Sequence, residues 1–291
     1  MQYWQSVFST EVDQLLDVAR IAEELGFDGL LISDHLLHFE KITSRYPYSP
    51  DGKPPSFSAS TEWPEAWSTI AAMCAVTRRL RFVTNVYILP LRHPVEVAKQ
   101  VSSVASLFEG RVGLGVGAGW MKEEFDAVGV DFDTRGARLN EAIELVRKLW
   151  SGDTVEHHGR FFELPPARMC PVPKQPIPIL VGGMSRGALR RAARYGDGWI
   201  GAGQRLEEAL ETLAELRRLR EREGRADQPF ETIVPLVEPL DRQIVARLEE
   251  AGVSGVVSYP FVFELGPRSS LADKRAYMER FAERVIRASA A

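Results

Sequence analysis

Cysteine is scarce in this sequence: there are two, Cys74 and Cys170, and they form no Cys-x-x-Cys pair. Two thiols make no disulfide framework, and their spacing offers no metal or redox motif. Long apolar runs are also missing, because no window approaches the roughly 20 apolar residues of a membrane span. The first residues lack a basic segment followed by an apolar one. We therefore expect a cytoplasmic protein with reduced cysteines and no membrane partner.

An excess of positive charge is absent as well. Lys and Arg number 36 against 40 Asp and Glu, which gives a formal net charge of −4. Binding to a phosphate backbone needs a basic field, so we predict no nucleic-acid partner. The sequence has no G-x-S-x-G elbow, no G-x-x-x-x-G-K-[ST] loop and no H-E-x-x-H motif, and its histidines show no metal-ligand spacing. These absences argue against hydrolysis and phosphoryl transfer, and we predict no metal site.

What the sequence does contain is an alternation of strand-like and helix-like segments along its 291 residues. Short apolar runs predict strands over 2–8, 27–33, 80–89, 111–116, 178–181, 199–201, 232–237 and 255–258. Apolar residues at helical spacing predict helices over 11–25, 67–76, 94–108, 138–150, 185–195, 206–223, 241–251 and 271–288. Eight strand-then-helix units predict an α/β fold, a (β/α)₈ TIM barrel, with residues 1–291 as a single domain.

Two stretches interrupt the alternation. Residues 40–64 are too rich in Pro, Gly and Ser for a helix. Because they follow the second strand, we expect a loop insertion that covers the C-terminal mouth of the barrel as a lid, in preference to plain surface decoration. Residues 153–175 predict a short hairpin or an extended excursion.

The segment Val-Gly-Gly-Met-Ser-Arg (181–186) ends a predicted strand and opens a helix. Gly182 and Gly183 allow close approach to an anion, the helix N-terminus offers free N–H groups, and Ser185 and Arg186 add side-chain donors. This predicts a phosphate cradle. The alternative interpretation is a tight strand–helix turn with a serine cap. The phosphate site is favoured because the segment follows a late strand of the barrel, where such sites often lie.

Three further strand ends carry candidate residues. Glycines alternate through residues 113–119, which clears space either for a flat tricyclic ring or for close packing inside the barrel. Ser33-Asp34-His35 ends the second predicted strand, where His35 has the chemistry for proton transfer and Asp34 for orienting it. A hydrogen-bonded pair without a catalytic role is the alternative. Asn85, at the end of the third strand, suits a ring edge or a simple turn.

Long segments of the chain resemble the luciferase-like monooxygenase superfamily and, within it, the actinobacterial group of probable coenzyme F420-dependent oxidoreductases. The segments that carry this resemblance are SDHLLH (33–38), SRYPYSPDGKPP (44–55), TNVYILPLRHPVEVAKQ (84–100), GRVGLGVGAGWMKEEFDAVGVDFDTRGARLNEAIELVRKLW (110–150) and PIPILVGGMSRGALRRAARYGDGW (176–199). The 110–150 and 176–199 segments are quite specific, whereas the last third of the chain shares only the barrel rhythm.

The resemblance implies a bacterial-luciferase-like barrel with the ring of a flavin or deazaflavin in its mouth. It implies that Asp34 and His35 flank the ring, and that Asn85-Val86 holds the position where this superfamily often has a non-prolyl cis peptide. It also implies that the cofactor cleft is lined by Gly117, Ala118 and Gly119. The cofactor phosphate would be held by Gly182, Gly183, Ser185 and Arg186.

The sequence departs from the deazaflavin-dependent sugar-phosphate dehydrogenases of this superfamily at two positions. Phe39 stands near the place where they have a Trp after the strand-two histidine, and Trp120 replaces their Glu after the fourth strand. These departures favour an apolar or aromatic substrate pocket, for which the candidate walls are Phe39, Tyr46, Trp63 and Trp120.

Three functions remain open from the sequence. The leading hypothesis is hydride transfer between F420 and a small organic substrate, with His35 as the proton partner and the protein as a homodimer. An FMN-dependent two-component monooxygenase using reduced flavin and oxygen is the alternative, and a non-catalytic flavin- or deazaflavin-binding protein is the third. The acidic tail of F420 calls for basic residues around the mouth, for which Arg45, Lys53 and Arg92 are candidates.

Overall fold

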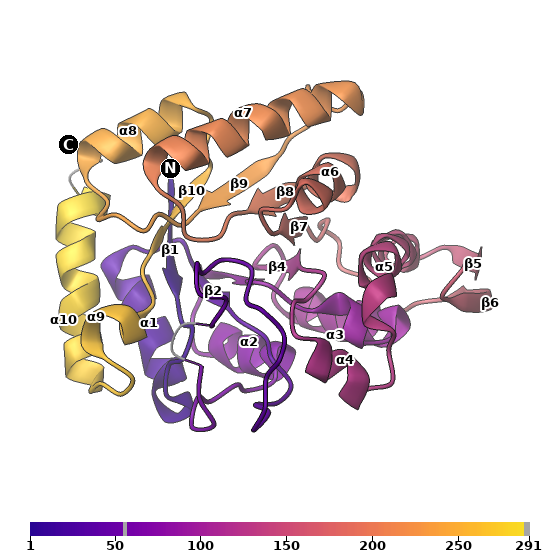
Figure 1. The fold of residues 1–291 in the computed structure, drawn as a ribbon, viewed down its shortest axis with the longest axis horizontal. Coiled ribbons are helices and arrows are strands. Elements are labelled where there is room, and N and C mark those ends of the chain that lie inside the picture. The colour runs from indigo at the N-terminus through magenta and orange to yellow at the C-terminus, as the bar shows by residue number, and fades with distance from the viewer. Residues whose placement is uncertain (55–56, 288–291) are drawn as a thin grey trace.

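A computed structural model describes residues 1–54 and 57–287. In that part of the chain, eight parallel strands close into a barrel and follow one another around it in sequence order (Figure 1). The strands are β1 (Gln2–Ser6), β2 (Gly29–Ile32), β3 (Arg81–Thr84), β4 (Val112–Val116), β7 (Ile179–Gly182), β8 (Gly198–Ile200), β9 (Glu231–Val234) and β10 (Gly255–Ser258).

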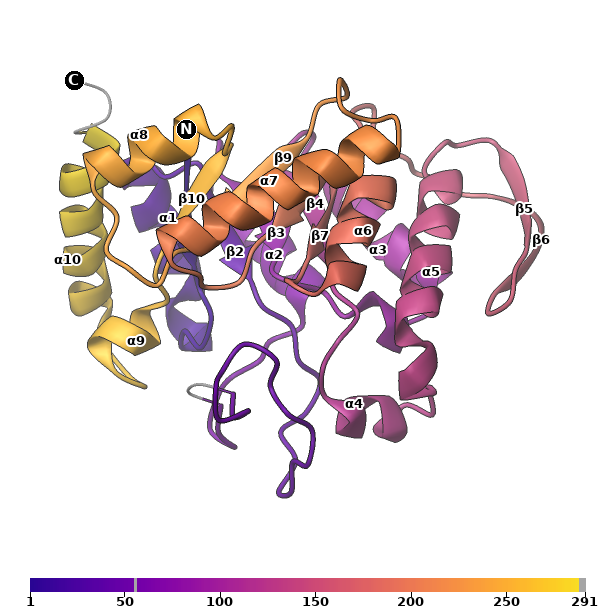
Figure 2. The ribbon, with the colours of Figure 1, turned by 45° about the horizontal axis from the view of Figure 1, so that its top comes forward.

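Helices surround the barrel and connect its strands (Figure 2). They are α1 (Leu15–Leu25), α2 (Ala66–Ala75), α3 (Pro94–Leu107), α4 (Lys122–Ala127), α5 (Arg135–Leu149), α6 (Arg186–Tyr195), α7 (Leu206–Arg222), α8 (Arg242–Glu250), α9 (Phe261–Leu265) and α10 (Leu271–Phe281), the last continued by a π-helical end, Ala282–Arg287. Single 3₁₀ turns lie at Val12–Gln14, Leu89–Leu91 and Phe132–Thr134. The predicted (β/α)₈ TIM barrel is confirmed.

The interior of the barrel is filled by one layer of large side chains from seven strands. The layer contains Trp4, Leu31, Val83, Leu180, Ile200, Ile233 and Val257. Strand β4 adds no large side chain to it, because Gly113 and Gly115 occupy its inward positions. A Cβ on Gly115 would lie 1.8 Å from the Thr84 carbonyl oxygen and 3.1 Å from Ile200. The glycines within β4 therefore serve close packing.

The structure differs from the predicted elements where segments are short. The strand predicted over 80–89 ends at Thr84 and is followed by a cis peptide between Asn85 and Val86. Helices α4 and α9 were not predicted, because they are too short for a clear helical period. Residues 153–175 contain the antiparallel hairpin of β5 (Thr154–His158) and β6 (Glu163–Arg168), which projects at the periphery beside α5 (Figure 1).

The loop between β2 and α2 contains neither helix nor strand in its described residues. It lies over the C-terminal ends of the strands, as expected of a lid. Within the described residues, no helix has both the length and the apolar character needed to cross a membrane. The same residues contain no group of three or more His, Cys, Asp or Glu that is arranged to hold a metal ion.

Candidate active site

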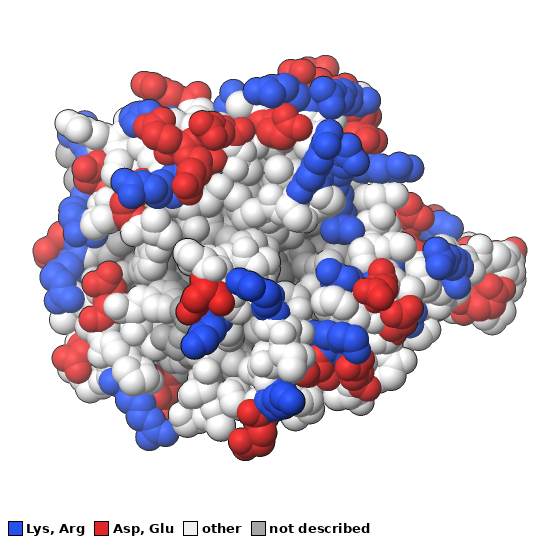
Figure 3. Space-filling view, in the orientation of Figure 1, with Lys and Arg blue, Asp and Glu red and all other residues white. Residues whose placement is uncertain are grey.

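A cleft of two lobes opens at the C-terminal ends of the strands. The inner lobe measures about 270 Å³ and the outer lobe about 800 Å³. Both lobes are lined by Tyr48, Val86, Ile88, Trp120, Gly182 and Gly183, so they form one continuous cleft. Figure 3 shows this face hollowed at its centre, with Lys and Arg along the rim on the side of α5 and α6.

The inner lobe lies above the barrel axis and is walled mainly by aromatic rings. Its lining includes His35, Asp34 and Asn85 from the ends of β2 and β3, and a ring of aromatic residues: Phe8, Tyr46, Tyr48, Phe57, Trp63, Trp120, Tyr259 and Phe263. Burial raises the pKa of Tyr46 to about 12, so this hydroxyl stays neutral at physiological pH.

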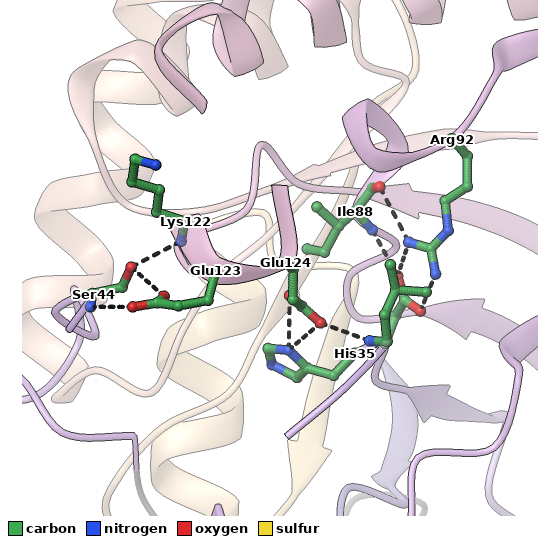
Figure 4. A network of polar contacts seen from close by, with 9 residues as sticks. His35, Ser44, Ile88, Arg92, Lys122, Glu123 and Glu124 are labelled. Atoms are coloured by element: carbon green, nitrogen blue, oxygen red, sulfur yellow. Dashed lines mark hydrogen bonds and ion pairs between the residues drawn. The ribbon is translucent and has the colours of Figure 1, made fainter. Parts of the chain in front are cut away.

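His35 stands in the inner lobe with one ring nitrogen engaged. Its Nδ1 lies 3.2 Å from both carboxylate oxygens of Glu124, and the Leu36 N–H donates to Glu124 Oε1 at 2.6 Å (Figure 4). The Glu124 side chain is only 2% exposed. A carboxylate accepts hydrogen bonds and cannot donate them, so the arrangement places the proton on Nδ1 and leaves Nε2 as the acceptor.

Asp34, the neighbour of His35, is hydrogen-bonded to other residues and does not orient the His35 ring. The Arg92 guanidinium donates to both of its carboxylate oxygens, at 2.5 and 2.8 Å, and the Ile88 N–H donates to Oδ2 at 2.9 Å (Figure 4). This buried, bidentate pair ties the end of β2 to the segment that follows β3. Arg92, which the sequence suggested for an acidic tail, is instead committed to Asp34.

Val86 forms a shelf between the two lobes. A Cβ added to Gly117 would lie 2.4 Å from Val86 Cγ2, and one added to Gly182 would lie 2.4 Å from Cγ1. Both positions must therefore be glycine for the Val86 side chain to fit between the ends of β4 and β7. The cis peptide bond that the resemblance implied joins Asn85 to this residue.

The turn from β7 to α6 borders the outer lobe. Gly183 has φ +114°, which favours glycine, and its carbonyl accepts a hydrogen bond from Trp199 Nε1 at 2.9 Å. Ser185 Oγ caps α6 by accepting from the Ala188 N–H at 3.2 Å. Both readings of this segment thus apply: it is a serine-capped turn, and it lines the outer lobe. Arg186 is exposed and lies outside the lining, which corrects its predicted place.

The basic residues that line the outer lobe are Arg45, Lys122, Arg135 and Arg191, and its described lining includes no Asp or Glu. The Lys122 ammonium is already paired with Asp126, on the same helix. Arg135 donates to the carbonyls of Phe132 and Gly119, and Arg191 to Asn140 and the Gly136 carbonyl. Within the described residues neither guanidinium has a carboxylate partner. Burial, together with the nearby charge of Arg135, lowers the pKa of Arg191. An anion in this lobe would relieve that repulsion.

The lid is anchored by Glu123, beside Glu124 on α4. Its carboxylate accepts from the backbone and side chain of Thr43 and of Ser44, at 2.6 to 3.1 Å, and points away from His35 (Figure 4). Burial alone would raise the pKa of Glu123, but the hydrogen bonds from Ser44 and Thr43 outweigh it and lower the pKa to about 2. Of two adjacent carboxylates on α4, Glu124 therefore binds His35 in the inner lobe, and Glu123 binds the lid beside the outer lobe.

Most predicted site residues meet in this cleft. Asp34, His35, Asn85, Val86, Tyr46, Trp63 and Trp120 line the inner lobe, and Gly117, Ala118, Gly119 and Ser185 line the outer one, with Gly182 and Gly183 common to both. Phe39 is the exception, since it lines neither lobe; Phe57, further along the lid, takes the aromatic position instead. Lys53 also stays outside. Glu124, Phe57, Arg135 and Arg191 were missed by sequence reasoning.

The fold is a parallel (β/α)₈ barrel, and its mouth holds a histidine–carboxylate pair beside a lobe lined by arginines. The C-terminal mouth is where enzymes with this fold place their active sites. Residues 4–287 match the family model described as luciferase-like monooxygenase. The chain belongs to the luciferase-like monooxygenase family. The members of this family are oxidoreductases and monooxygenases, and the comparisons indicate a flavin or deazaflavin cofactor.

Two relatives show where the chain lies within the family. It is 41% identical over 288 residues to an uncharacterized protein of Mycobacterium tuberculosis (strain H37Rv), covering 98% of this chain and 99% of the relative. It is 33% identical over 231 residues to the F420-dependent glucose-6-phosphate dehydrogenase of Gordonia bronchialis, covering 77% of this chain and 63% of the relative.

Two solved structures share the fold. The monooxygenase RslO1 from Streptomyces bottropensis superposes with a TM-score of 0.77 at 19% identity, covering 99% of both chains. An F420-dependent secondary alcohol dehydrogenase in complex with an F420–acetone adduct gives the same TM-score at 17% identity, covering 98% of both chains.

Proposed function

We propose that this protein is an F420-dependent oxidoreductase that transfers a hydride between the deazaflavin and a small organic substrate. The proposal rests on one observation: the two lobes of the cleft carry different groups. The outer lobe is lined by arginines, and the inner lobe holds His35, whose Nε2 is available as an acceptor. The relationship to F420-dependent glucose-6-phosphate dehydrogenase supports the same cofactor.

The outer lobe fits the polar part of the cofactor. Arg135 and Arg191 lack carboxylate partners among the described residues, and the N-terminus of α6 adds a positive dipole end. FMN carries one phosphate, whereas F420 carries a phosphate and an acidic tail. Three arginines, Arg45, Arg135 and Arg191, in a lobe of about 800 Å³ match the longer anion better. The ring would then lie over the Val86 shelf, facing the inner lobe.

The bound deazaflavin would supply a two-electron hydride donor or acceptor. His35 completes the reaction with a proton. When an alcohol is oxidised, Nε2 takes the hydroxyl proton as the hydride leaves carbon; when a ketone is reduced, Nε2 returns a proton to the oxygen. Glu124 acts through His35 as a positioning residue, because it fixes the ring and stabilises the imidazolium that forms. The lid and the aromatic walls exclude water.

Parallel titrations of the apo-protein with F420 and with FMN test the proposal. We expect micromolar binding of F420 and much weaker binding of FMN, read from fluorescence or heat. A clear preference for FMN would replace the proposal with a two-component monooxygenase. Binding of neither cofactor would remove the basis for both.

A further inference from the structure

We propose that the inner lobe accepts an uncharged, largely apolar ketone or alcohol that carries a flat ring, and that it rejects phosphorylated and carboxylated compounds. This inference rests on the proposed function for its chemistry and deepens it by naming the substrate class. It separates this chain from the sugar-phosphate specificity that the name of its Gordonia relative states.

The first support is the set of rings around the reactive histidine. Phe57, Trp63 and Trp120 surround the His35 imidazole, with ring centroids 4.9, 4.7 and 5.9 Å away. Phe57 also lies 5.7 Å from Trp63 and 6.4 Å from Trp120. A substrate whose oxygen reaches His35 Nε2 must therefore lie between aromatic faces and edges, which bind flat apolar groups.

A second wall continues this surface on the far side of the lobe. Phe8, after β1, packs on Trp63 at 5.3 Å and on Phe263 at 5.9 Å, and Tyr259 lies 5.8 Å from Phe263. Phe8, near the start of the chain, meets Tyr259 and Phe263, near its end, because β1 pairs with β10. The lobe is thus lined by rings from β1, the lid, β4 and the α9 segment.

The third support is the charge of the lining. Among the described residues around the inner lobe there is no Lys or Arg, and Asp34 is the only charged one apart from His35 in its protonated form. The Asp34 carboxylate is already paired with Arg92. A phosphate or carboxylate that entered here would lose its hydration without gaining a cation, which is costly.

The cations nearby belong to the other lobe. Trp120 lines both lobes, and Tyr46 packs on it at 5.3 Å and on Tyr48 at 5.4 Å. This line of rings separates His35 from Arg45, Arg135 and Arg191, whose charges the cofactor tail would neutralise. One oxygen on an otherwise apolar substrate is what His35 Nε2 and the neutral Tyr46 hydroxyl can bind.

Binding of matched ligands tests the inference. Acetophenone, 4-acetylbenzoate and glucose 6-phosphate are titrated into the F420-loaded protein, in which the cofactor occupies the cationic outer lobe, with heat and tryptophan fluorescence as readouts. We expect acetophenone to bind at least about tenfold more tightly than 4-acetylbenzoate, and glucose 6-phosphate not to saturate. The inference is overturned if either anionic ligand binds as tightly as acetophenone, or if acetophenone does not bind.

Two variants and a control locate the binding site. Trp63→Leu and Phe57→Leu should each weaken acetophenone several-fold, since each removes an aromatic wall. Phe161→Leu, on the peripheral hairpin, should leave it unchanged. Circular dichroism identifies a variant that fails to fold, and the other then carries the test. The two proposals fail separately: loss of F420 binding opposes the function, whereas F420 binding with equal affinity for charged ligands opposes only the substrate class.

Discussion

The two lobes of the cleft share six lining residues yet differ in chemistry. The inner lobe is walled by rings and has one charged side chain, Asp34, which is already paired with Arg92. The outer lobe is lined by three arginines and by Lys122, which is paired with Asp126, and has no carboxylate in its described lining. Val86 and Trp120 form the boundary. The comparison teaches how a single cleft can divide its chemistry: the basic side chains line one lobe and the aromatic rings line the other, and Val86 and Trp120 are common to both.

The largest expected effect comes from the inner lobe. His35→Ala removes the proton partner, so kcat should fall by about 10²–10⁴-fold while F420 affinity stays within about twofold. Steady-state kinetics and cofactor titration measure the two. His158→Ala, on the exposed hairpin, is the matched control. Unchanged turnover in His35→Ala would contradict this assignment and show that another group or water supplies the proton.

The next effect compares two adjacent carboxylates. Glu124→Gln should lower kcat by about tenfold or more with little change in KM, because the carboxylate that orients His35 loses its charge. Glu123→Gln should instead raise KM, since it loosens the lid. We would measure kcat and KM for both variants, and the pH profile of kcat for Glu124→Gln. These measurements distinguish a residue that positions His35 from one that anchors the lid. A change in KM alone for Glu124→Gln would show that this residue has a structural role only.

A third variant concerns the outer lobe. Arg135→Met should weaken F420 by about tenfold, the effect of losing one charge-assisted hydrogen bond. Arg186→Met, on the same rim but outside the lining, should change the affinity by less than twofold. Calorimetric titration of both variants gives the comparison, and the reverse order of effects would restore Arg186 to the phosphate site.

The barrel was predictable from sequence because its strands and helices repeat with clear apolar periods. Residues at strand ends, such as His35 and Asn85, were also found, since the ends of parallel strands meet at one mouth. Glu124 was missed because α4 is too short for a period, and only folding brings it to His35. Arg135 and Arg191 come from two helices, so their approach has no linear signal. The sequence could not distinguish Phe39 from Phe57, which is the ring that lines the cleft, because an irregular loop has no period that orders its aromatics.

The smallest effect is a pH dependence of the lid. The folded-state pKa of Glu123 is about 2, below its ordinary 4.5. Its contribution to lid anchoring is therefore complete above about pH 4.5 and is lost as the pH falls towards 2. Pepsin cleavage within residues 33–65, normalised to cleavage of an unfolded peptide, should rise across this range. Glu123→Gln should lose this pH dependence; the same rise in both proteins would contradict the assignment.

The measurement that tests the central claim most directly compares F420 with 8-hydroxy-5-deazariboflavin, which has the same ring and ribityl chain but neither phosphate nor acidic tail. Both are titrated into the apo-protein at low and high salt. If the outer lobe binds the anionic tail, F420 binds at least about tenfold more tightly at low salt, and the difference narrows as salt screens the cations. Equal affinities at both salt concentrations would contradict the division of the cleft into a charged and an apolar lobe.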